Sequence, residues 1–325
     1  MVEYSNVKRI VQANFPKAKI KSIKEFTEGY NNITYKIRLD IGNFVVKLIK
    51  LKGYEKYLLK QEKIRSIVRK KFKNFPIARI LKSDYGNKII DNPYIILEMI
   101  DGESLQSTYP KIENKDKLYE EIGELYGKLH SIKMSSYGEL DSNLHIIKKY
   151  KSWYNSNSNE SKKLLEEIKE KGPLPKKTIS QNEVYFRENR YLLKQEFGPC
   201  LCHGDAADTN LIVKKIGKQY QVNGLIDFEF SRASGATKEL FNGLRSFDRK
   251  YAHRSSIVKG YTKWSKLPKD WEKLIFFYQW MAHLKQLTKI KGMKWRNLSD
   301  KETLERKKDL RKKSIAELKK IVKQV

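Results

Sequence analysis

The sequence predicts an α+β protein in which a small antiparallel sheet forms one lobe and a larger, mostly helical part forms another. About five strand-like runs lie before residue 100, and segments with helical spacing dominate after it. The last of these predicted strands ends at Asp101-Gly102, which marks the boundary between the two parts. Strands and helices that are segregated in this way are typical of the α+β class, and a cleft is expected between the two lobes.

The first lobe is expected to begin with an amphipathic helix over residues 2–15, which ends before Pro16. A basic helix is expected over residues 54–73. The first three strands follow one another through turns rich in Gly and Asn, so they should form an antiparallel meander. The expected strands cover residues 20–26, 33–39, 44–49, 77–82 and 93–100.

The second lobe is expected to contain a helix over residues 115–132 and an amphipathic helix over residues 304–325. The polar stretch 150–185 is interpreted as a variable, mobile surface insertion around one helix, residues 161–171. The aromatic run that includes Phe276 and Trp280 either lines a pocket or belongs to the core.

Composition limits the possible classes of protein. The 325 residues are 39% hydrophobic, and 68 basic residues outweigh 38 acidic ones to give a formal net charge of +30. Such a charge attracts polyanions non-specifically. The high charge is also explained by a general compositional bias, without any dedicated binding site. No apolar run approaches the roughly 20 residues of a membrane span. The only cysteines, Cys200 and Cys202, suit neither a disulfide framework nor a zinc site, so a reducing cytoplasmic location is expected.

Three polar residues stand out in an apolar neighbourhood, namely Asp205, Asn210 and Asp227. Two short apolar runs around a Gly-Lys-Gln tip predict a β-hairpin between Asn210 and Asp227. If Lys218 and Gln219 form the tip, Leu211 pairs with Ile226 and Asn210 faces Asp227. The hairpin would then bring an amide and a carboxylate together.

This arrangement suits magnesium-dependent chemistry on a hydroxyl group. Carboxylate and amide oxygens are hard ligands of the kind that Mg²⁺ prefers, so Asn210 and Asp227 are the predicted metal ligands. Asp205, five residues before Asn210, is the predicted catalytic base that accepts a proton from a substrate hydroxyl. His203 is a second catalytic candidate, with a structural role in the loop as the alternative.

The run His203-Gly-Asp-x-x-x-x-Asn, with Ile-Asp-Phe-Glu downstream, closely resembles the motifs of the aminoglycoside phosphotransferase-like small-molecule kinases. The resemblance implies a two-lobed protein-kinase-like fold, ATP (or GTP) and Mg²⁺ as cofactors, and transfer of the γ-phosphate to a hydroxyl group. It places the nucleotide-binding lobe at residues 1–97, the hinge at 98–103 and the acceptor-binding lobe at 104–325. Gly204 stands where protein kinases have Arg, and no Ala-Pro-Glu follows, so a small-molecule acceptor is expected.

The resemblance also implies residues that bind the nucleotide. Lys47 would hold the α- and β-phosphates and would be positioned by an ion pair with Glu62. The turn with Asn31 and Asn32 would line the phosphates. The backbone at Glu98 and Ile100 would read the adenine edge. Where the family has Gly-x-Pro-x-x-Asp-Leu, this chain has Ala-Thr-Lys-Glu239-Leu, which leaves open whether that acid still ties the lobe together.

The expected partner is a small molecule with a hydroxyl group, and the protein is expected to be a monomer or a weak dimer. Two other classes of function remain possible. The first is a metal-dependent phosphohydrolase that uses His203, Asp205 and Asp227. The second is a nucleic-acid-binding pseudokinase that functions through its basic surface. The complete set of Lys47, Asp205, Asn210 and Asp227 argues against a vestigial cleft.

Overall fold

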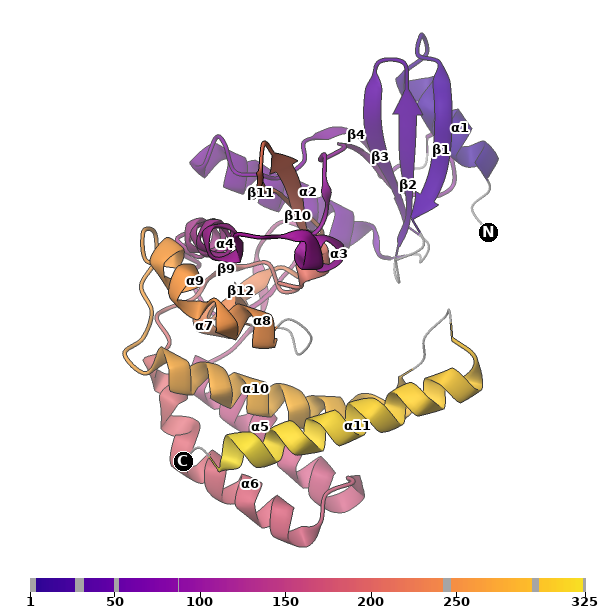
Figure 1. The fold of residues 1–325 in the computed structure, drawn as a ribbon. Coiled ribbons are helices and arrows are strands. Elements are labelled where there is room, and N and C mark those ends of the chain that lie inside the picture. The colour runs from indigo at the N-terminus through magenta and orange to yellow at the C-terminus, as the bar shows by residue number, and fades with distance from the viewer. Residues whose placement is uncertain are drawn as a thin grey trace.

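The structure is a computed structural model that describes residues 4–26, 32–49, 53–86, 88–241, 247–293 and 298–323. The chain folds into a smaller lobe that holds the N-terminus and a larger, mainly helical lobe (Figure 1). This division confirms the predicted two-lobed α+β class.

The smaller lobe is built on a five-stranded antiparallel sheet in the order β1-β2-β3-β5-β4. Helix α1 (Tyr4–Asn14) buries Val7, Ile10 and Val11 in the same apolar cluster as residues of the sheet, as its helical spacing predicts. Helix α2 (Glu55–Lys71) follows the third strand and runs toward the larger lobe (Figure 1). The strands are β1 (Ile20–Phe26), β2 (Asn32–Leu39), β3 (Gly42–Ile49), β4 (Ile80–Asp84) and β5 (Tyr94–Glu98).

The larger lobe contains two small sheets besides its helices. The three-stranded sheet has the order β11-β10-β6 and includes the predicted hairpin, β10 (Leu211–Ile216) and β11 (Gln219–Leu225), next to β6 (Glu103–Ser104). The four-stranded sheet, which was not expected from the sequence, has the order β8-β7-β12-β9. Its strands are β7 (Gly138–Leu140), β8 (Ile146–Lys149), β9 (Cys200–Cys202) and β12 (Arg232–Ser234).

The long helices of this lobe pack in pairs. Helix α4 (Lys115–His130) packs closely against α9 (Arg254–Tyr261), where the position of Gly123 leaves no room for a Cβ beside the carbonyl of Ile257. Helix α10 (Trp271–Lys289) packs against α5 (Trp153–Lys171) and α11 (Asp300–Val322). The shorter helices are α3 (Leu105–Thr108), α7 (Ala236–Leu240) and α8 (Phe247–Ala252), and single 3₁₀ turns include η3 (Asp208–Asn210) and η4 (Phe228–Phe230).

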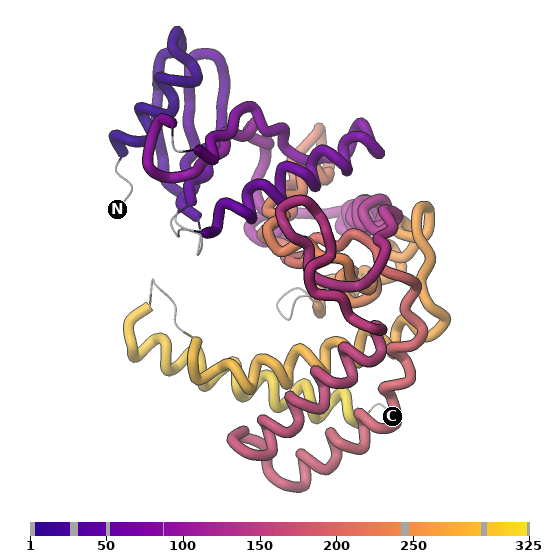
Figure 2. Tube along the Cα trace, turned by 180° about the vertical axis from the view of Figure 1, so that it is seen from behind, coloured from indigo at the N-terminus to yellow at the C-terminus, as the bar shows by residue number. Residues whose placement is uncertain are grey.

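The stretch 150–185 is not a surface excursion around one helix, which corrects the prediction. It forms α5 and most of α6 (Lys176–Asn189), and both helices contribute to an apolar cluster with α10 and α11. Two residues of the polar run within α5, Asn157 and Ser158, are buried, and Asn157 Nδ2 donates to the carbonyl oxygen of Trp153 at 2.9 Å. Both views place α5 and α6 at the opposite end of the molecule from the N-terminal sheet (Figures 1 and 2).

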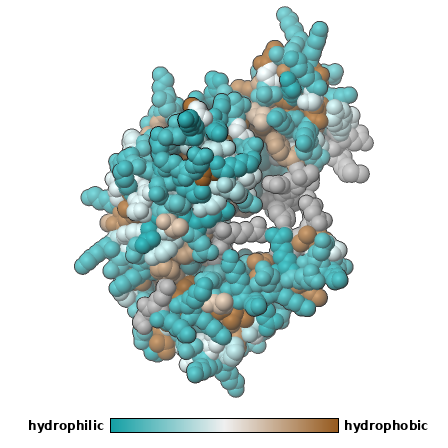
Figure 3. All heavy atoms as spheres, viewed as in Figure 1, coloured by the Kyte–Doolittle hydropathy of each residue, from teal (hydrophilic) through white to brown (hydrophobic). Residues whose placement is uncertain are grey.

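The surface agrees with the composition. Hydrophilic residues dominate the face shown in Figure 3, and apolar residues are scattered among them. None of the helices in the described ranges has both the length and the apolar character that a bilayer-crossing helix requires. Both cysteines are free and buried.

Candidate active site between the lobes

The predicted hairpin forms, but its register differs by one residue from the prediction. Leu211 pairs with Leu225, and the two-residue turn is Gly217-Lys218 because Gly217 adopts the left-handed conformation, at φ +60°. A bulge after Ile212 then shifts the pairing by one residue. Asn210 consequently lies opposite Ile226, whose N–H donates to the Asn210 carbonyl oxygen at 3.0 Å. Asp227 is the next residue, so the hairpin still brings Asn210 and Asp227 to the same end.

Asn210 is fixed by the residue that the sequence predicts as the base. Its Nδ2 donates to the backbone carbonyl oxygen of Asp205 and to Asp205 Oδ2, each at 2.9 Å. The carboxylate of Asp205 keeps its other oxygen, Oδ1, without a hydrogen bond to any described residue, and the residue is half-buried. The structure therefore holds one oxygen of Asp205 and leaves the other without a partner among the described residues.

Asp227 has an unusual backbone conformation and pairs with a lysine of the smaller lobe. Its φ is +68°, a left-handed conformation that Asp tolerates better than most residues and that costs about 1–3 kcal/mol when it is imposed on a side chain. Its Oδ1 lies 2.7 Å from Lys47 Nζ, and the Lys47 side chain is only 11% exposed. Burial opposes ionisation of Asp227, but the charge and hydrogen bond of Lys47 lower the pKa of the carboxyl group below its ordinary value.

The predicted ion pair between Lys47 and Glu62 does not form. Glu62 instead accepts a hydrogen bond of 2.5 Å from the hydroxyl of Tyr85. The reason is the rotation of α2, which directs Leu58, Gln61 and Arg65 inward at helical spacing. Glu62 is one position further along and is turned by about 100° to the side of the helix.

The inner face of α2 contacts the segment that follows Asp227. The Arg65 guanidinium lies 5.8 Å from the ring centroid of Phe228, and Lys60 Nζ donates to the carbonyl oxygen of Ser231 at 3.3 Å. Burial lowers the pKa of Arg65 to about 10 and that of Lys60 to about 8. These two cations were not identified from the sequence, because a basic helix of this composition gives no sign of which lysine or arginine faces inward.

His203 is held on both sides by backbone groups. Its Nδ1 accepts from the N–H of Asp205 at 3.3 Å, so the ring proton lies on Nε2, which donates to the carbonyl oxygen of Ile226 at 2.8 Å. Its side chain is fully buried. The ring therefore links the predicted base to the strand end that precedes Asp227, and neither nitrogen is free for a metal or a proton transfer.

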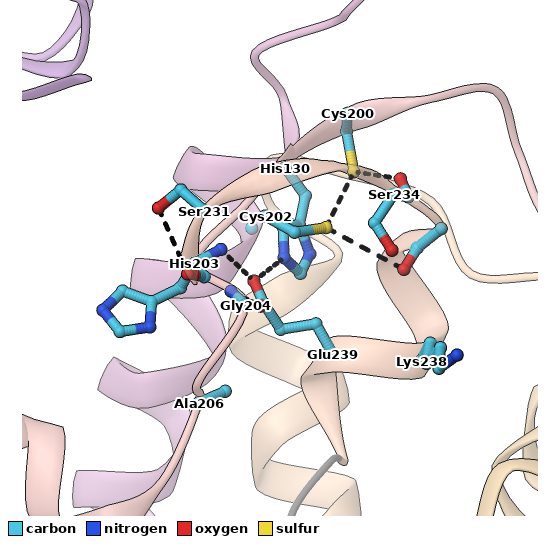
Figure 4. A network of polar contacts seen from close by, with 12 residues as sticks. His130, Cys200, Cys202, His203, Gly204, Ala206, Ser231, Ser234, Lys238 and Glu239 are labelled. Carbon is cyan, nitrogen blue, oxygen red and sulfur yellow. Dashed lines mark hydrogen bonds and ion pairs between the residues drawn. The ribbon is translucent and has the colours of Figure 1, made fainter. Parts of the chain in front are cut away.

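Glu239 of α7 ties the loop to the helices, which settles the question that the sequence left open. Its Oε2 accepts from the N–H of His203 at 2.7 Å and lies 2.9 Å from His130 Nε2, and its Oε1 accepts from the N–H of Gly204 at 2.5 Å (Figure 4). Although burial opposes ionisation, the hydrogen bond and charge of His130 lower the pKa of Glu239 to about 2. The loop before Asp205 is thus held by a buried, charged carboxylate.

A second set of contacts holds the other side of the loop. Arg249 of α8 lies 2.7 Å from Asp208 Oδ2, and the Asp208 side chain is 1% exposed. Lys250, also of α8, donates from Nζ to the carbonyl oxygen of Ala206 at 2.7 Å. Helix α8 therefore supports the loop through two adjacent cations.

Asn32, Glu98 and Ile100 are the other predicted nucleotide-binding residues that the structure describes. Asn31 falls outside the described residues. Asn32 begins β2 and donates from Nδ2 to Glu229 Oε2 at 2.9 Å, a contact between the two lobes. The Glu98 carboxylate pairs with Arg79 at 3.0 Å, and the Glu98 N–H donates to the carbonyl oxygen of Arg79. The carboxylate and the N–H of Glu98 therefore already have partners.

Ile100 has free backbone groups. Neither its N–H nor its carbonyl group bonds to a described residue. Ile100 and Asp101 both contact the hairpin. Asn223 Nδ2 donates to the carbonyl oxygen of Asp101 at 2.7 Å, and the side chain of Ile100 lies so close to Gly224 that a Cβ added to this glycine would clash with it. The predicted hinge and the hairpin with Asn210 are thus in direct contact.

The donor set fits Mg²⁺. Asp227 Oδ2 and Asn210 Oδ1 have no hydrogen-bond partner among the described residues, and both are hard oxygen ligands. Asp227 is partly exposed, with 34% of its side-chain surface accessible. One carboxylate and one amide, with substrate phosphates completing the shell, are the usual composition of such a site.

The fold is similar to those of solved phosphotransferases. A point variant of aminoglycoside 2′-phosphotransferase-IIIa in its GDP complex aligns with a TM-score of 0.69 and 14% identity, over 98% of this chain and 97% of that chain. The GDP and kanamycin complex of APH(2″)-IIIa aligns with a TM-score of 0.65 and 14% identity, over 97% of both chains. A thermostable variant of APH(4)-Ia with ADP and hygromycin B aligns with a TM-score of 0.60 and 12% identity, over 98% of both chains. At these identities the similarity establishes the fold alone.

Sequence comparison extends this result to the family. No curated protein matches the chain in sequence. A sequence profile of the phosphotransferase enzyme family APH matches residues 22–286, which include both lobes and the whole candidate site. The chain therefore belongs to the APH phosphotransferase enzyme family.

Proposed function

We propose that this protein transfers the γ-phosphate of ATP or GTP to a hydroxyl group of a small molecule, with Mg²⁺ as cofactor. The observation that carries the proposal is the convergence of four residues from both lobes at one point. Asp205 is hydrogen-bonded to Asn210 at 2.9 Å, and Asp227 is paired with Lys47 at 2.7 Å. The proposal is supported by membership of a phosphotransferase family.

In this proposal each residue has a separate task. Asp205 positions the acceptor hydroxyl and accepts its proton on Oδ1, the oxygen that Asn210 leaves free. Lys47 binds the α- and β-phosphates, and Asn210 Oδ1 and Asp227 would hold Mg²⁺. When bound, the metal supplies charge neutralisation on the transferred phosphoryl group. The chain itself contributes positioning, through the buried Glu239 and His203 contacts behind the loop.

His203 has a positioning role in this proposal. Its two ring nitrogens bond to the N–H of Asp205 and the carbonyl oxygen of Ile226, so it orients the base and does not touch the substrate. The same contacts occupy both ring nitrogens of His203, one of the three residues that a metal-dependent phosphohydrolase would use. The pseudokinase alternative is not supported either, because all four cleft residues are present and arranged around one point.

The acceptor is proposed to be a small molecule. Solved neighbours of this fold are complexes with kanamycin or hygromycin B, both in the presence of a nucleotide. In the present chain only eight residues separate Asp227 from α7, which begins at Ala236, so no long segment is available to bind a peptide acceptor.

Nucleotide binding and product formation test the proposal separately. The dissociation constants of ATP and GTP would be measured with and without Mg²⁺, and ADP or GDP release would be measured across a panel of hydroxyl compounds. We expect binding that strengthens with Mg²⁺ and that Asp205→Asn preserves, whereas this substitution reduces turnover by about 10²–10⁴-fold. Absence of binding at millimolar nucleotide, or full turnover by Asp205→Asn, would overturn the proposal.

A further inference from the structure

Two side-chain contacts join neighbouring parts of the two lobes at the cleft. The first is the ion pair of Lys47 and Asp227, at 2.7 Å. The second is the hydrogen bond of 2.9 Å from Asn32 Nδ2 to Glu229 Oε2. Asn32 and Lys47 lie on the adjacent strands β2 and β3, and Glu229 follows Asp227 by two residues. Both contacts therefore connect the same part of the small sheet to the same segment of the larger lobe.

The contact between Asn32 and Glu229 is buried and has a defined direction. Asn32 is 7% exposed and Glu229 is 6% exposed. A carboxylate only accepts hydrogen bonds, so the Asn32 amide presents Nδ2 to Glu229. Its oxygen, Oδ1, is then buried without a hydrogen-bond partner among the described residues. An unpaired buried acceptor is costly, so the hydrogen bond to the charged carboxylate determines the orientation of this amide.

Nucleotide binding affects the two contacts differently. In the proposed function Lys47 binds phosphates and Asp227 binds Mg²⁺, so their ion pair is exchanged for contacts with the ligand. The turn that ends at Asn32 would line the phosphates with backbone N–H groups, which leaves the Asn32 side chain on Glu229. The hydrogen bond between Asn32 and Glu229 therefore persists when the ion pair is lost.

This hydrogen bond connects two parts that must be placed accurately for phosphoryl transfer. Asn32 is the first residue of β2 and follows the turn that is predicted to line the phosphates. Glu229 belongs to η4, the 3₁₀ turn directly after the predicted metal ligand Asp227. The bond sets the distance between the phosphate-lining turn and the metal-binding residue, and displacements of about 1 Å at such places cost about 10²-fold in rate.

We propose that Glu229 is a positioning residue for the nucleotide, acting through Asn32. It holds the phosphate-lining turn of the smaller lobe against the segment of Asp227 after Lys47 and Asp227 have exchanged their ion pair for the ligand. This role rests on the function proposed above. It requires no contact between Glu229 and the metal or the substrate.

Exchanging the donor and the acceptor tests the contact. Glu229→Ala removes the acceptor, and Asn32→Asp places two carboxylates against each other. Each should weaken binding of ATP or GTP in the presence of Mg²⁺ about tenfold, the effect of losing a hydrogen bond to a charged group. The double variant Asn32→Asp/Glu229→Gln reverses the direction of the bond and should bind within about threefold of the wild type. A double variant that binds no better than Asn32→Asp alone would overturn the proposal.

Glu229→Gln alone distinguishes positioning from metal binding. The amide oxygen of Gln still accepts from Asn32, so nucleotide affinity should fall less than about threefold. A loss as large as that of Glu229→Ala, which Asn32→Asp does not relieve, would mean that Glu229 binds the metal and would overturn the proposal. Asn43→Asp is the control for added charge, because Asn43 is an exposed residue of β3 in the same lobe, and it should leave the affinity unchanged.

Thermal midpoints without nucleotide show whether each variant is folded. If Asn32→Asp is poorly folded, Asn32→Ala replaces it, and Asn32→Ala/Glu229→Ala should then bind no more weakly than either single variant. Losses that multiply in this double variant would overturn the proposal, since two independent structural roles would produce them.

The same titrations separate this role from the kinase function. Wild-type protein that binds neither nucleotide at millimolar concentration would overturn the proposed function and the role of Glu229 together. Nucleotide binding by the wild type that Glu229→Ala retains in full would overturn only the role of Glu229. The values of kcat and KM for the nucleotide in the ADP-release assay should recover together in Asn32→Asp/Glu229→Gln, which a loss of general stability would not allow.

Discussion

Lys47 Nζ and Asp227 Oδ1 lie 2.7 Å apart across the two lobes, although 180 positions separate the residues in the chain. Lys47 comes from β3 of the smaller lobe, and Asp227 follows β11 of the larger one. In the proposed function both partners have other tasks, with Lys47 on phosphates and Asp227 on Mg²⁺. Without this ion pair, each of the two charges would be partly buried without a counter-charge.

Replacing Lys47 by Met should weaken nucleotide binding and lower kcat/KM for the nucleotide by about 10²–10³-fold, as removal of one positioned donor does in other enzymes. Nucleotide titration and the ADP-release assay measure both effects. Lys82→Met is the matched control, because Lys82 is an exposed lysine on β4 of the same sheet. Comparable losses in the two variants would show that general charge, and not the position of Lys47, is responsible.

The substitution Glu62→Gln tests which partner of Glu62 matters for nucleotide binding, Tyr85 as observed or Lys47 as predicted. Because Glu62 bonds to Tyr85 and not to Lys47, and Gln can still accept from the Tyr85 hydroxyl, the KM for nucleotide should change less than about threefold. Steady-state kinetics at saturating acceptor measure this change. A loss as large as that of Lys47→Met would contradict this expectation and would mean that Glu62 moves onto Lys47 when the nucleotide binds.

Local patterns in the sequence were sufficient to predict the lobes, the five-stranded sheet and the hairpin. The register was wrong because the turn lies at Gly217-Lys218, one position earlier than predicted, which shifts the pairing by two residues, and a bulge after Ile212 restores only one of them. The predicted ion pair between Glu62 and Lys47 was wrong because the rotation of α2 depends on which of its side chains pack against the other lobe. Glu239 could not be decided, because its position beside His203 and His130 depends on the path of the chain between β12 and α7.

The insertion was misinterpreted for a different reason. A run of Asn and Ser is normally a turn signal, since these side chains compete for backbone groups. In α5 and α6 the same side chains bond to carbonyl groups one turn earlier, and Asn182 also accepts a hydrogen bond from Trp280 Nε1 at 2.7 Å. Composition therefore predicted a loop where tertiary contacts stabilise helices.

The pH dependence of stability should report the buried Glu239. Its pKa falls from an ordinary 4.5 to about 2 in the folded protein, so between these values the unfolded state binds more protons. The stabilisation that this carboxylate provides is therefore complete above about pH 4.5 and is lost as the pH falls toward 2. Removing one partner of such a buried pair costs about 3–5 kcal/mol.

Urea unfolding of the wild type and Glu239→Gln measures this effect. The difference in free energy of unfolding should be largest near neutral pH and should shrink below pH 4.5, the ordinary pKa of the group. Glu317→Gln is a control for general loss of a carboxylate, since Glu317 lies at the surface of α11 in an ion pair with Lys320. A difference that stays constant with pH would show that Glu239 is not ionised in the folded protein.

Two glycines with left-handed backbones allow a matched test of the loop that carries Asp205. Gly204 has φ +86°, and a Cβ added there would lie 2.0 Å from the carbonyl oxygen of Phe230. Gly217, in the hairpin turn, has φ +60° and no heavy atom within 4 Å of the same added Cβ. Gly217→Ala should therefore cost only the backbone strain of about 1–2 kcal/mol. Gly204→Ala adds a clash with the backbone of Phe230, and this clash is relieved only if the loop at Gly204 or the segment at Phe230 moves.

We expect Gly204→Ala to destabilise the protein more than Gly217→Ala and to lower kcat selectively. The clash displaces the loop between His203 and Asp205, so the base moves relative to the acceptor, and small displacements of this kind cost about 10²-fold in rate. Nucleotide affinity should be less affected, since Lys47 lies on the other lobe. Urea unfolding, kcat and the nucleotide dissociation constant together measure the effect. Equal stability and equal kcat in the two variants would show that the contact between Gly204 and Phe230 does not position Asp205.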